Sequence, residues 1–371
     1  MSRSRLRPPS LSDCPDQFHD IVQVAFTGMS DESMRRPVVD VGIPTRERPH
    51  LVLQAIDSVL AQTLSDWRLL VSENGPGGDE TERAVAPYLA DPRISYAATG
   101  ADVGGAENWT RVIQHGDAPY VALLHDDDLW DPTFLERRVS FMEAHPDCGF
   151  VFSGNKEIDA NGVVIRATEF VLSEGVHQPE SIFPLLYEHN VMGQPSILVR
   201  RTAYDAVGPY FDSNFFPYWD YEMCLRLAAR FPCGYLAVRD CSYRMHDVRM
   251  TFTVRQFGKA YLETIDRADE LLAERPQLRV APQVRRRRRA QALLTTALDA
   301  IESGDRHAGG RRMAEALRLY PRVAVDVRFP TAVLAFLAGR SGRRALAKAR
   351  YFVHQRGIRL HRRAKADLRR G

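Results

Sequence analysis

The sequence predicts an α/β fold, in which helices cover a mostly parallel sheet, followed by a basic helical region. Three observations lead to this prediction. Short β-rich apolar runs alternate with segments of helical periodicity between residues 38 and 144. From about residue 256 the pattern is almost wholly helical. The charge is also divided, because residues 281–371 hold 23 Lys and Arg against 6 Asp and Glu, whereas residues 1–280 carry a net charge of −14.

Each element follows from its own local pattern. Apolar runs rich in β-branched residues predict strands at 38–43, 67–71, 94–96, 120–124, 149–153 and 197–199. Apolar residues three and four positions apart predict helices at 51–60, 81–89, 107–115, 134–144 and 221–229. Two amphipathic stretches within 286–321, joined by Ser303-Gly304-Asp305, predict an α-hairpin. Ligands bind beyond the carboxyl ends of parallel strands, which directs attention to the loops after Ile43, Val71 and Leu124.

The amino-acid composition is typical of a globular protein. Apolar residues make up 44% and charged residues 26% of the chain, which excludes a disordered or fibrous protein. We expect an extension at 1–36 (flexible, or an artefact of an upstream start codon), an α/β domain at 37–255, and the basic helical region at 256–371. No apolar run approaches the roughly 18 residues of a spanning helix. Five cysteines without a C-x-x-C pair, and no signal-peptide core, predict a reduced cytoplasmic protein.

The strongest candidate site is His125-Asp126-Asp127-Asp128, directly after an apolar strand. Three adjacent carboxylates repel one another, and a bound cation or a cationic ligand relieves this repulsion. Hard oxygen ligands suit Mg²⁺ or Mn²⁺. The alternative is a solvated acidic turn that caps the helix after Pro132.

Three further motifs carry groups suited to ligands. Residues 72–79 combine Glu73 and Asn74 with glycines that let the backbone approach a ligand, or they form a plain turn. Asp220 lies among aromatic residues at a helix start, which suits a general base or an N-cap. His246 could ligate a metal and Arg249 could meet a diphosphate, or both are structural. No P-loop, dinucleotide, nucleophile-elbow or His-Glu-x-x-His motif occurs, which disfavours those enzyme classes.

Taken together, these segments resemble family 2 of the inverting glycosyltransferases, over about residues 38–250. The resemblance rests on residues 39–49, 55–63, 72–75, 102–109, 125–128, 193–196 and 219–226. It implies a GT-A fold and transfer of a sugar, with inversion, from a nucleoside-diphosphate sugar to an acceptor hydroxyl. It also implies a Mn²⁺ or Mg²⁺ cofactor and a role in cell-envelope, polysaccharide or glycolipid synthesis. The chain departs from the family pattern at Glu73, Asp102, His125 and Trp219.

The resemblance, together with the chemistry of each motif, implies a role for individual residues. Asp220 is the expected catalytic base, and the expected metal ligands are Asp127, Asp128 and His246. The expected donor-binding residues are Pro44, Thr45, Arg46, Glu47, Glu73, Asn74, Asp102, Asn108, Asp126, Asp127 and Arg249. The expected acceptor-side residues are Gln194, Trp219 and Glu222. This interpretation requires Asp127 and Asp220 to face each other across one cleft.

Two other function classes stay open, a nucleotidyltransferase on a related α/β scaffold and a non-catalytic module that binds sugar nucleotides. The expected partners are a nucleoside-diphosphate sugar and a glycan or lipid-linked acceptor, and we expect no nucleic acid. The basic segments 285–289 and 340–370 suit an anionic membrane surface, at the inner face of the plasma membrane. The alternatives for these segments are docking onto the acidic domain of this chain, or formation of a homo-oligomer.

Overall fold

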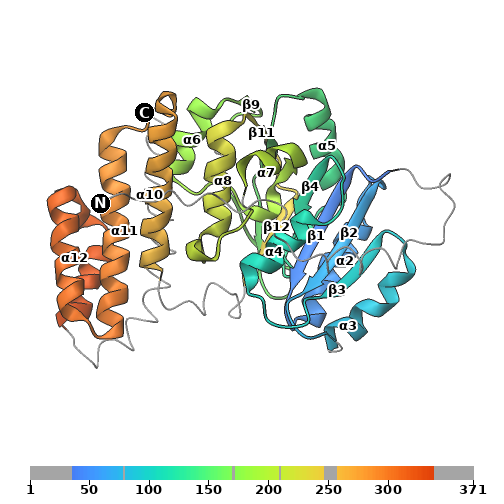
Figure 1. Cartoon of the computed structure of the whole chain (residues 1–371), viewed down its shortest axis with the longest axis horizontal. Coiled ribbons are helices and arrows are strands. Elements are labelled where there is room, and N and C mark those ends of the chain that lie inside the picture. Colours follow the sequence, from blue (N-terminus) through green and yellow to red (C-terminus); the bar gives the residue numbers. More distant parts are fainter. Residues whose placement is uncertain (1–35, 78–79, 169–171, 209, 246–256, 338–371) are drawn as a thin grey trace, which may run out of the picture. The chain divides into compact units, whose positions relative to one another are not determined.

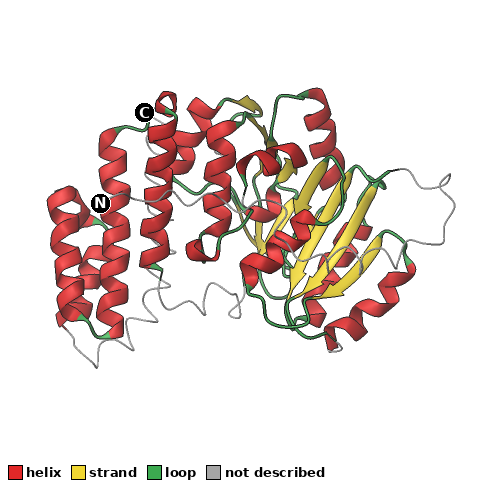
Figure 2. Cartoon of the chain, viewed as in Figure 1, coloured by secondary structure: helices red, strands yellow, loops and turns green. Residues whose placement is uncertain are grey.

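The computed structural model describes residues 36–77, 80–168, 172–208, 210–245 and 257–337 (Figure 1). Its centre is an eight-stranded sheet with the strand order β3-β2-β1-β4-β10-β6-β11-β9. The first four strands of this order are parallel to one another, whereas β10 runs antiparallel to both of its neighbours. Helices flank the sheet, as the sequence predicts (Figure 2).

The strands and helices of the α/β part follow the predicted alternation as far as residue 153, whereas the strands at 175–177 and 233–236 and the helices at 179–188 and 201–207 are not among the predicted elements. The sheet strands are β1 (Val39–Thr45), β2 (Trp67–Glu73), β3 (Ile94–Ala98), β4 (Tyr120–Leu123), β6 (Phe150–Ser153), β9 (Gly175–His177), β10 (Leu198–Arg200) and β11 (Cys233–Leu236). The helices are α2 (Pro49–Leu60), α3 (Glu80–Val85), η2 (Ala86–Ala90), α4 (Gly105–Gln114), α5 (Phe134–Ala144), α6 (Pro179–Glu188), η3 (Gln194–Ser196), α7 (Arg201–Val207), η4 (Ser213–Phe215) and α8 (Trp219–Arg230).

A second, four-stranded sheet has no counterpart among the predicted elements. Its order is β5 (Leu129–Trp130), β12 (Cys241–Arg244), β7 (Lys156–Ile158) and β8 (Val164–Ala167). Strand β5 begins one residue after the acidic motif, and β12 pairs with it in antiparallel register. This sheet therefore fixes the C-terminal side of the motif.

Apolar clusters on the two faces of the large sheet explain why its strands are apolar throughout. Every residue of β1 is buried. Val39, Val41 and Ile43 pack against α2 and α5, while the opposite face, with Leu70, packs against α4, α6 and α8. A Cβ atom at Gly42 would lie 2.5 Å from the Cβ of Val112, so glycine lets α4 pack directly on β1. Strands covered on both faces are typical of parallel α/β sheets.

The C-terminal part is helical, as predicted. It comprises α10 (Gly258–Glu274), η5 (Pro276–Leu278), α11 (Pro282–Ser303), α12 (Arg306–Leu319) and η6 (Pro321–Val325). Helices α11 and α12 form the predicted α-hairpin, which turns at Gly304 with φ 103°. This left-handed value ends α11 with the residue type that adopts it at least cost. Helix α10 packs against both α11 and α8.

The arginines of segment 285–289 interact mainly within the chain. Arg287 contacts Glu188 at 2.6 Å, and Arg289 contacts Asp266 at 2.7 Å. Arg288 donates a hydrogen bond of 3.1 Å to the carbonyl of Tyr187. These contacts favour, for these side chains, the alternative that the segment docks onto its own chain. Segment 340–370 lies outside the described residues.

Two further expectations concern cysteines and membrane spans. Cys148, Cys224, Cys233 and Cys241 are free thiols in buried positions, as expected, whereas Cys14 falls outside the described residues. Within the described ranges, no helix is long and apolar enough to cross a membrane.

Candidate active site

The acidic motif lies at the carboxyl end of β4, beside the turn that follows β1. Thr45, the last residue of β1, donates a hydrogen bond of 2.8 Å from its hydroxyl to Oδ2 of Asp126. Strands β1 and β4 are parallel neighbours, so their carboxyl ends meet at one sheet edge. Two segments 81 residues apart are thus joined by one buried hydrogen bond, where ligands are expected.

Arg48 places a positive charge at this site, and it is not among the predicted site residues. Its Nη1 lies 3.0 Å from Oδ1 of Asp126 and 3.3 Å from Oδ2 of Asp127. The residue falls inside the matched segment 39–49, but nothing in its spacing distinguishes it from Arg46. Arg46 turns elsewhere and contacts the exposed carboxylate of Asp102 at 2.7 Å.

The turn between Thr45 and Arg48 has a strained backbone. Glu47 has φ 53°, a left-handed value that costs a residue with a side chain roughly 1–2 kcal/mol. Its N–H donates a 2.9 Å hydrogen bond to Oε1 of Glu73, at the end of β2. Glu73 is fully buried and holds this backbone in place. Glu47 itself is exposed at the site surface, and Pro44 is buried within β1.

Asn74 and Asp102 form a second linked pair at the same edge. The amide nitrogen of Asn74 donates to Oδ1 of Asp102 at 3.0 Å, and its amide oxygen accepts from the N–H of Val103. The N–H of Gly104 also donates to Asp102 and, with Asn74 and Arg46, lowers the pKa of this exposed carboxyl. These contacts order the loop that leads into α4.

Asn108, an expected donor-binding residue, is buried in the protein interior. It is buried between β2 and α4, where its amide oxygen accepts from the hydroxyl of Ser72 at 2.6 Å. Its amide nitrogen donates to the Ser72 carbonyl at 2.9 Å. In this structure Asn108 therefore ties α4 to the end of β2.

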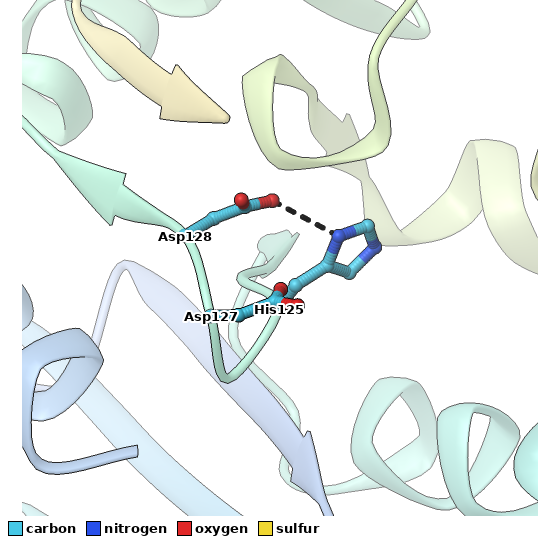
Figure 3. Close-up of side chains that lie close together, drawn as sticks. All are labelled: His125, Asp127 and Asp128. Atoms are coloured by element: carbon cyan, nitrogen blue, oxygen red, sulfur yellow. Dashed lines mark hydrogen bonds and ion pairs between the residues drawn. The ribbon is translucent and has the colours of Figure 1, made fainter. Parts of the chain in front are cut away.

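Asp128 and His125 form a pair within the acidic motif (Figure 3). Nδ1 of His125 lies 3.0 Å from Oδ2 of Asp128, and the N–H of Arg244 on β12 donates to Oδ1 of Asp128 at 2.8 Å. Arg244 also donates from Nε to the carbonyl of Asp127 at 2.8 Å. Arg244 thus holds the motif in its bent conformation, and the sequence shows no signal for this, since β12 follows β5 by more than a hundred residues.

Burial changes the protonation equilibria of the motif. The pKa of Asp126 is raised to about 6, first by burial and then by the charge of Asp127. Burial likewise raises the pKa of Asp128 to about 6. Burial alone would lower the pKa of His125, but nearby carboxylates outweigh it and the pKa is raised. Those carboxylates belong to Asp128, Asp127 and Asp220.

Asp220 reaches this cluster from the start of α8. It lies close enough to His125 for each charge to shift the pKa of the other group. Burial raises the pKa of Asp220, and the N–H of Tyr221 partly opposes this by donating a 2.7 Å hydrogen bond to its Oδ1. His125 therefore lies within electrostatic range of both Asp127 and Asp220.

Aromatic rings connect α8 with the acidic motif. The ring of Trp219 lies 5.3 Å from that of Trp109 on α4, and Trp109 lies 4.9 Å from His125. A Cβ atom at Gly105 would lie 2.6 Å from Cη2 of Trp219, so the first turn of α4 closely approaches this ring. In the sequence, Trp109 is only the last residue of the segment 102–109, and nothing there signals its contact with His125.

Two of the expected acceptor-side residues have partners below the surface. Both carboxylate oxygens of Glu222 accept from Nε of Arg226, at 2.8 and 3.0 Å, and Arg267 of α10 lies 3.6 Å away. Gln194 is buried in η3 and hydrogen-bonds Tyr204. Arg138 holds η3 through the carbonyl of Ser196. Glu222 and Gln194 therefore make contacts within the protein interior.

The residues of the motif fit a divalent cation. His125, Asp127 and Asp128 each offer one ligand atom, and these atoms lie within 4.8 Å of one another. Nε2 of His125 is buried and has no hydrogen-bond partner among the described residues. Carboxylate oxygens with one imidazole suit Mn²⁺ or Mg²⁺. His246 and Arg249, the other residues expected at the metal and the diphosphate, lie outside the described ranges.

Comparison with known sequences supports this reading. Residues 40–208 match the family described as Glycosyl transferase family 2. The putative colanic acid biosynthesis glycosyl transferase WcaA of Escherichia coli K12 is 24% identical, covering 74% of this chain and 98% of its own. The protein y4gI of Sinorhizobium fredii is 28% identical over 56% of this chain, which spans 22% of that relative.

A third relative carries a more specific name. It is the UDP-Glc:alpha-D-GlcNAc-diphosphoundecaprenol beta-1,3-glucosyltransferase WfgD of Escherichia coli. It is 28% identical over 34% of this chain and 49% of its own length.

Solved structures share the fold. Residues 1–349 of S. aureus TarS, in complex with UDP-GlcNAc, superpose with a TM-score of 0.58 at 12% identity, over 84% of this chain and 91% of that chain. The mannosyltransferase PcManGT of Pyrobaculum calidifontis, in complex with GDP-Man and Mn²⁺, gives a TM-score of 0.50 at 16% identity, over 86% and 92%. Residues 40–208 of this chain therefore belong to glycosyl transferase family 2, in a domain with the GT-A fold.

Proposed function

We propose that this chain is an inverting, metal-dependent glycosyltransferase that uses a nucleoside-diphosphate sugar as donor. The observation that carries the proposal is the position of His125, whose pKa responds to both Asp127 and Asp220. An acidic cluster suited to a cation and a carboxylate suited to a base thus both lie within electrostatic range of one imidazole. This arrangement supports the interpretation that Asp127 and Asp220 serve one reaction centre.

In this proposal Asp220 is the general base. Burial raises the pKa of Asp220, which gives the carboxylate a higher affinity for a proton. It removes the proton of the acceptor hydroxyl as the oxygen attacks the anomeric carbon from the face opposite the diphosphate. Inversion follows from this single displacement, and general base catalysis typically contributes about 10²–10⁴-fold.

The leaving diphosphate requires positive charge. Asp127 would hold a divalent cation together with Asp128 and His125, and such an ion supplies Lewis-acid stabilisation of the diphosphate when bound. Arg48 adds a fixed cation beside Asp126 and Asp127. The turn with Glu47, and the linked pair Asn74 and Asp102, are proposed to hold the nucleoside.

The acceptor is proposed to be a glycan or a lipid-linked sugar in the synthesis of a polysaccharide or another envelope component. Two relatives support this proposal. WcaA is named for colanic acid biosynthesis, and the name of WfgD specifies a diphosphoundecaprenol-linked acceptor. TarS binds UDP-GlcNAc and PcManGT binds GDP-Man, so UDP- and GDP-sugars are the first donors to test.

The test uses the full chain with Mn²⁺ and a panel of UDP-, GDP- and dTDP-sugars. A rise in the melting temperature selects the donor, because a ligand that binds the native state stabilises it. Release of the nucleoside diphosphate is then measured with an acceptor panel, and NMR of the product gives the anomeric configuration. Donor binding without transfer to any acceptor would favour the sugar-nucleotide-binding module, and product with retained configuration would refute inversion.

A further inference from the structure

A cavity of about 210 Å³ lies outside the candidate active site, at the N-terminal end of α11. Residues from α10, α11 and the end of α12 line it. They are Asp269, Pro282, Arg285, Arg286, Arg289 and Leu319. Three of these six residues are arginines and one is an aspartate, so basic side chains outnumber acidic ones in the lining.

Asp269 organises two of these arginines. Its Oδ1 accepts from Nε of Arg285 at 2.8 Å and from the hydroxyl of Tyr187 at 2.9 Å. Its Oδ2 lies 3.4 Å from Nη1 of Arg289, which also contacts Asp266 at 2.7 Å. Asp269 therefore holds two guanidinium groups side by side at the cavity wall.

The positive charge around the cavity exceeds the negative charge. Three guanidinium groups are opposed by the two carboxylates of Asp266 and Asp269. Arg286 is exposed, and the described part of the chain offers it no acidic partner. One cation thus remains available to an anion from outside.

Hydrogen-bond donors also remain available. A guanidinium carries five N–H donors, and the contacts of Arg285 with Asp269 and Tyr187 do not use all of them. The N-cap of α11, Ala281, has no capping side chain, and the first turn of the helix holds no acidic residue. The helix end therefore adds to the positive potential that the arginines create.

We propose that this cavity binds a phosphate group. The planar fork of a guanidinium matches the oxygen geometry of phosphate, and several arginines on one small cavity suit a group with several anionic oxygens. The group belongs either to the headgroup of an anionic lipid or to a free phosphate ion. This inference goes beyond the transfer reaction and does not depend on it, since it concerns residues outside the candidate active site.

The test for a free ion is calorimetric titration of the full chain with inorganic pyrophosphate in EDTA. Arg286→Ala should weaken binding about tenfold, the value for one charge-assisted hydrogen bond. The matched control is Arg311→Ala, an exposed arginine on α12 that does not line the cavity. Asp127→Ala should bind as the wild type does, which separates this cavity from the donor site.

The test for a lipid is flotation with phosphatidylcholine vesicles that either contain or lack phosphatidylglycerol, at two salt concentrations. Loss of binding to the anionic vesicles in Arg286→Ala, with Arg311→Ala unaffected, identifies the headgroup as the source. Loss of pyrophosphate binding alone identifies a free phosphate. The proposal is overturned if neither probe binds, or if the two variants behave alike. Donor turnover is measured separately, so a failure here leaves the transfer reaction untouched.

Discussion

Arg48 lies 3.0 Å from Oδ1 of Asp126, and the same nitrogen lies 3.3 Å from Asp127. The guanidinium of Arg48 thus places a positive charge beside two carboxylates of the acidic motif. The divalent ion proposed at Asp127 would share these carboxylates with Arg48, so the arginine would both stabilise the metal-free protein and compete with the ion for negative charge.

Replacing this arginine should therefore increase the effect of metal on stability. In Arg48→Met, the metal-free protein should lose about 1–3 kcal/mol of unfolding free energy, because two adjacent carboxylates lose a charged donor. Excess Mn²⁺ should restore most of this loss. Thermal unfolding with EDTA and with Mn²⁺ measures both effects.

Arg46→Met is the matched control, since its ion pair with Asp102 is exposed and should contribute about 0–1 kcal/mol. An equal response to Mn²⁺ in Arg48→Met and wild type would argue against a metal at Asp127.

Asp220→Asn tests the proposed base. Asparagine keeps an oxygen for the N–H of Tyr221, but it cannot accept a proton. We expect kcat to fall about 10²–10⁴-fold while the Kd of the donor changes less than about twofold. The measurements are steady-state turnover and donor titration. Asp212→Asn serves as the control, because Asp212 caps η4 through the N–H of Asn214 and asparagine caps nearly as well. Turnover within tenfold of wild type would exclude Asp220 as the base.

Burial raises the pKa values of Asp126 and Asp128 to about 6, so the proposed binding of a metal ion should depend on pH. A cation would bind the ionised carboxylates and the neutral imidazole of His125, so its affinity should rise with pH, up to about tenfold per pH unit for each proton displaced. Titration of Mn²⁺ at several pH values measures the slope. In Asp128→Asn one of these protons is absent, so the slope should decrease.

Asp126 and Asp128 should make the metal-free protein less stable as the pH rises, whereas the affinity for a cation should increase. Their folded pKa exceeds the unfolded value of 3.8, so the folded chain binds more protons between about pH 4 and pH 6. Their contribution to stability is complete below about pH 4 and is lost as the pH rises through 6. Urea unfolding in EDTA should therefore show a smaller loss over this range in Asp128→Asn than in wild type. Identical pH profiles would contradict the raised pKa of Asp128.

Gly105→Ala tests the contact between α4 and α8. The added methyl would lie 2.6 Å from Cη2 of Trp219, so the ring beside Asp220 must move. We expect kcat/KM to fall about tenfold, because the displaced ring of Trp219 adjoins the proposed base Asp220 and small displacements of reacting groups slow catalysis. Trp219→Phe in the same chain should recover part of the loss, and a double-mutant cycle measures this coupling.

Gly310→Ala on α12, where the nearest atom would lie 3.4 Å away, is the control. Additive effects of the two substitutions would mean that the contact does not position α8.

Much of the α/β part could be predicted from local pattern. Strand β1 and helix α2 are recognisable because buried strands are continuously apolar, and because the apolar positions of α2 repeat with the helical period. The second sheet could not be predicted. Its strands β7 and β8 are short, β7 is partly buried and β8 is mostly exposed. The pairing of β7 with β12 and of β8 with β7, rather than their own composition, therefore decides their conformation.

The sequence by itself determined which chemical groups are present: an acidic motif after an apolar strand, and an acidic residue at the start of a helix. It also determined the order of the elements, because periodicity and burial are properties of neighbouring residues. Only the tertiary structure decided that Arg48 rather than Arg46 meets the motif, that Arg244 fixes it, and that Asp220 comes within reach of His125. Those relationships join segments about 80 to 120 residues apart, and such contacts depend on how strands pair and helices pack, which no local pattern specifies.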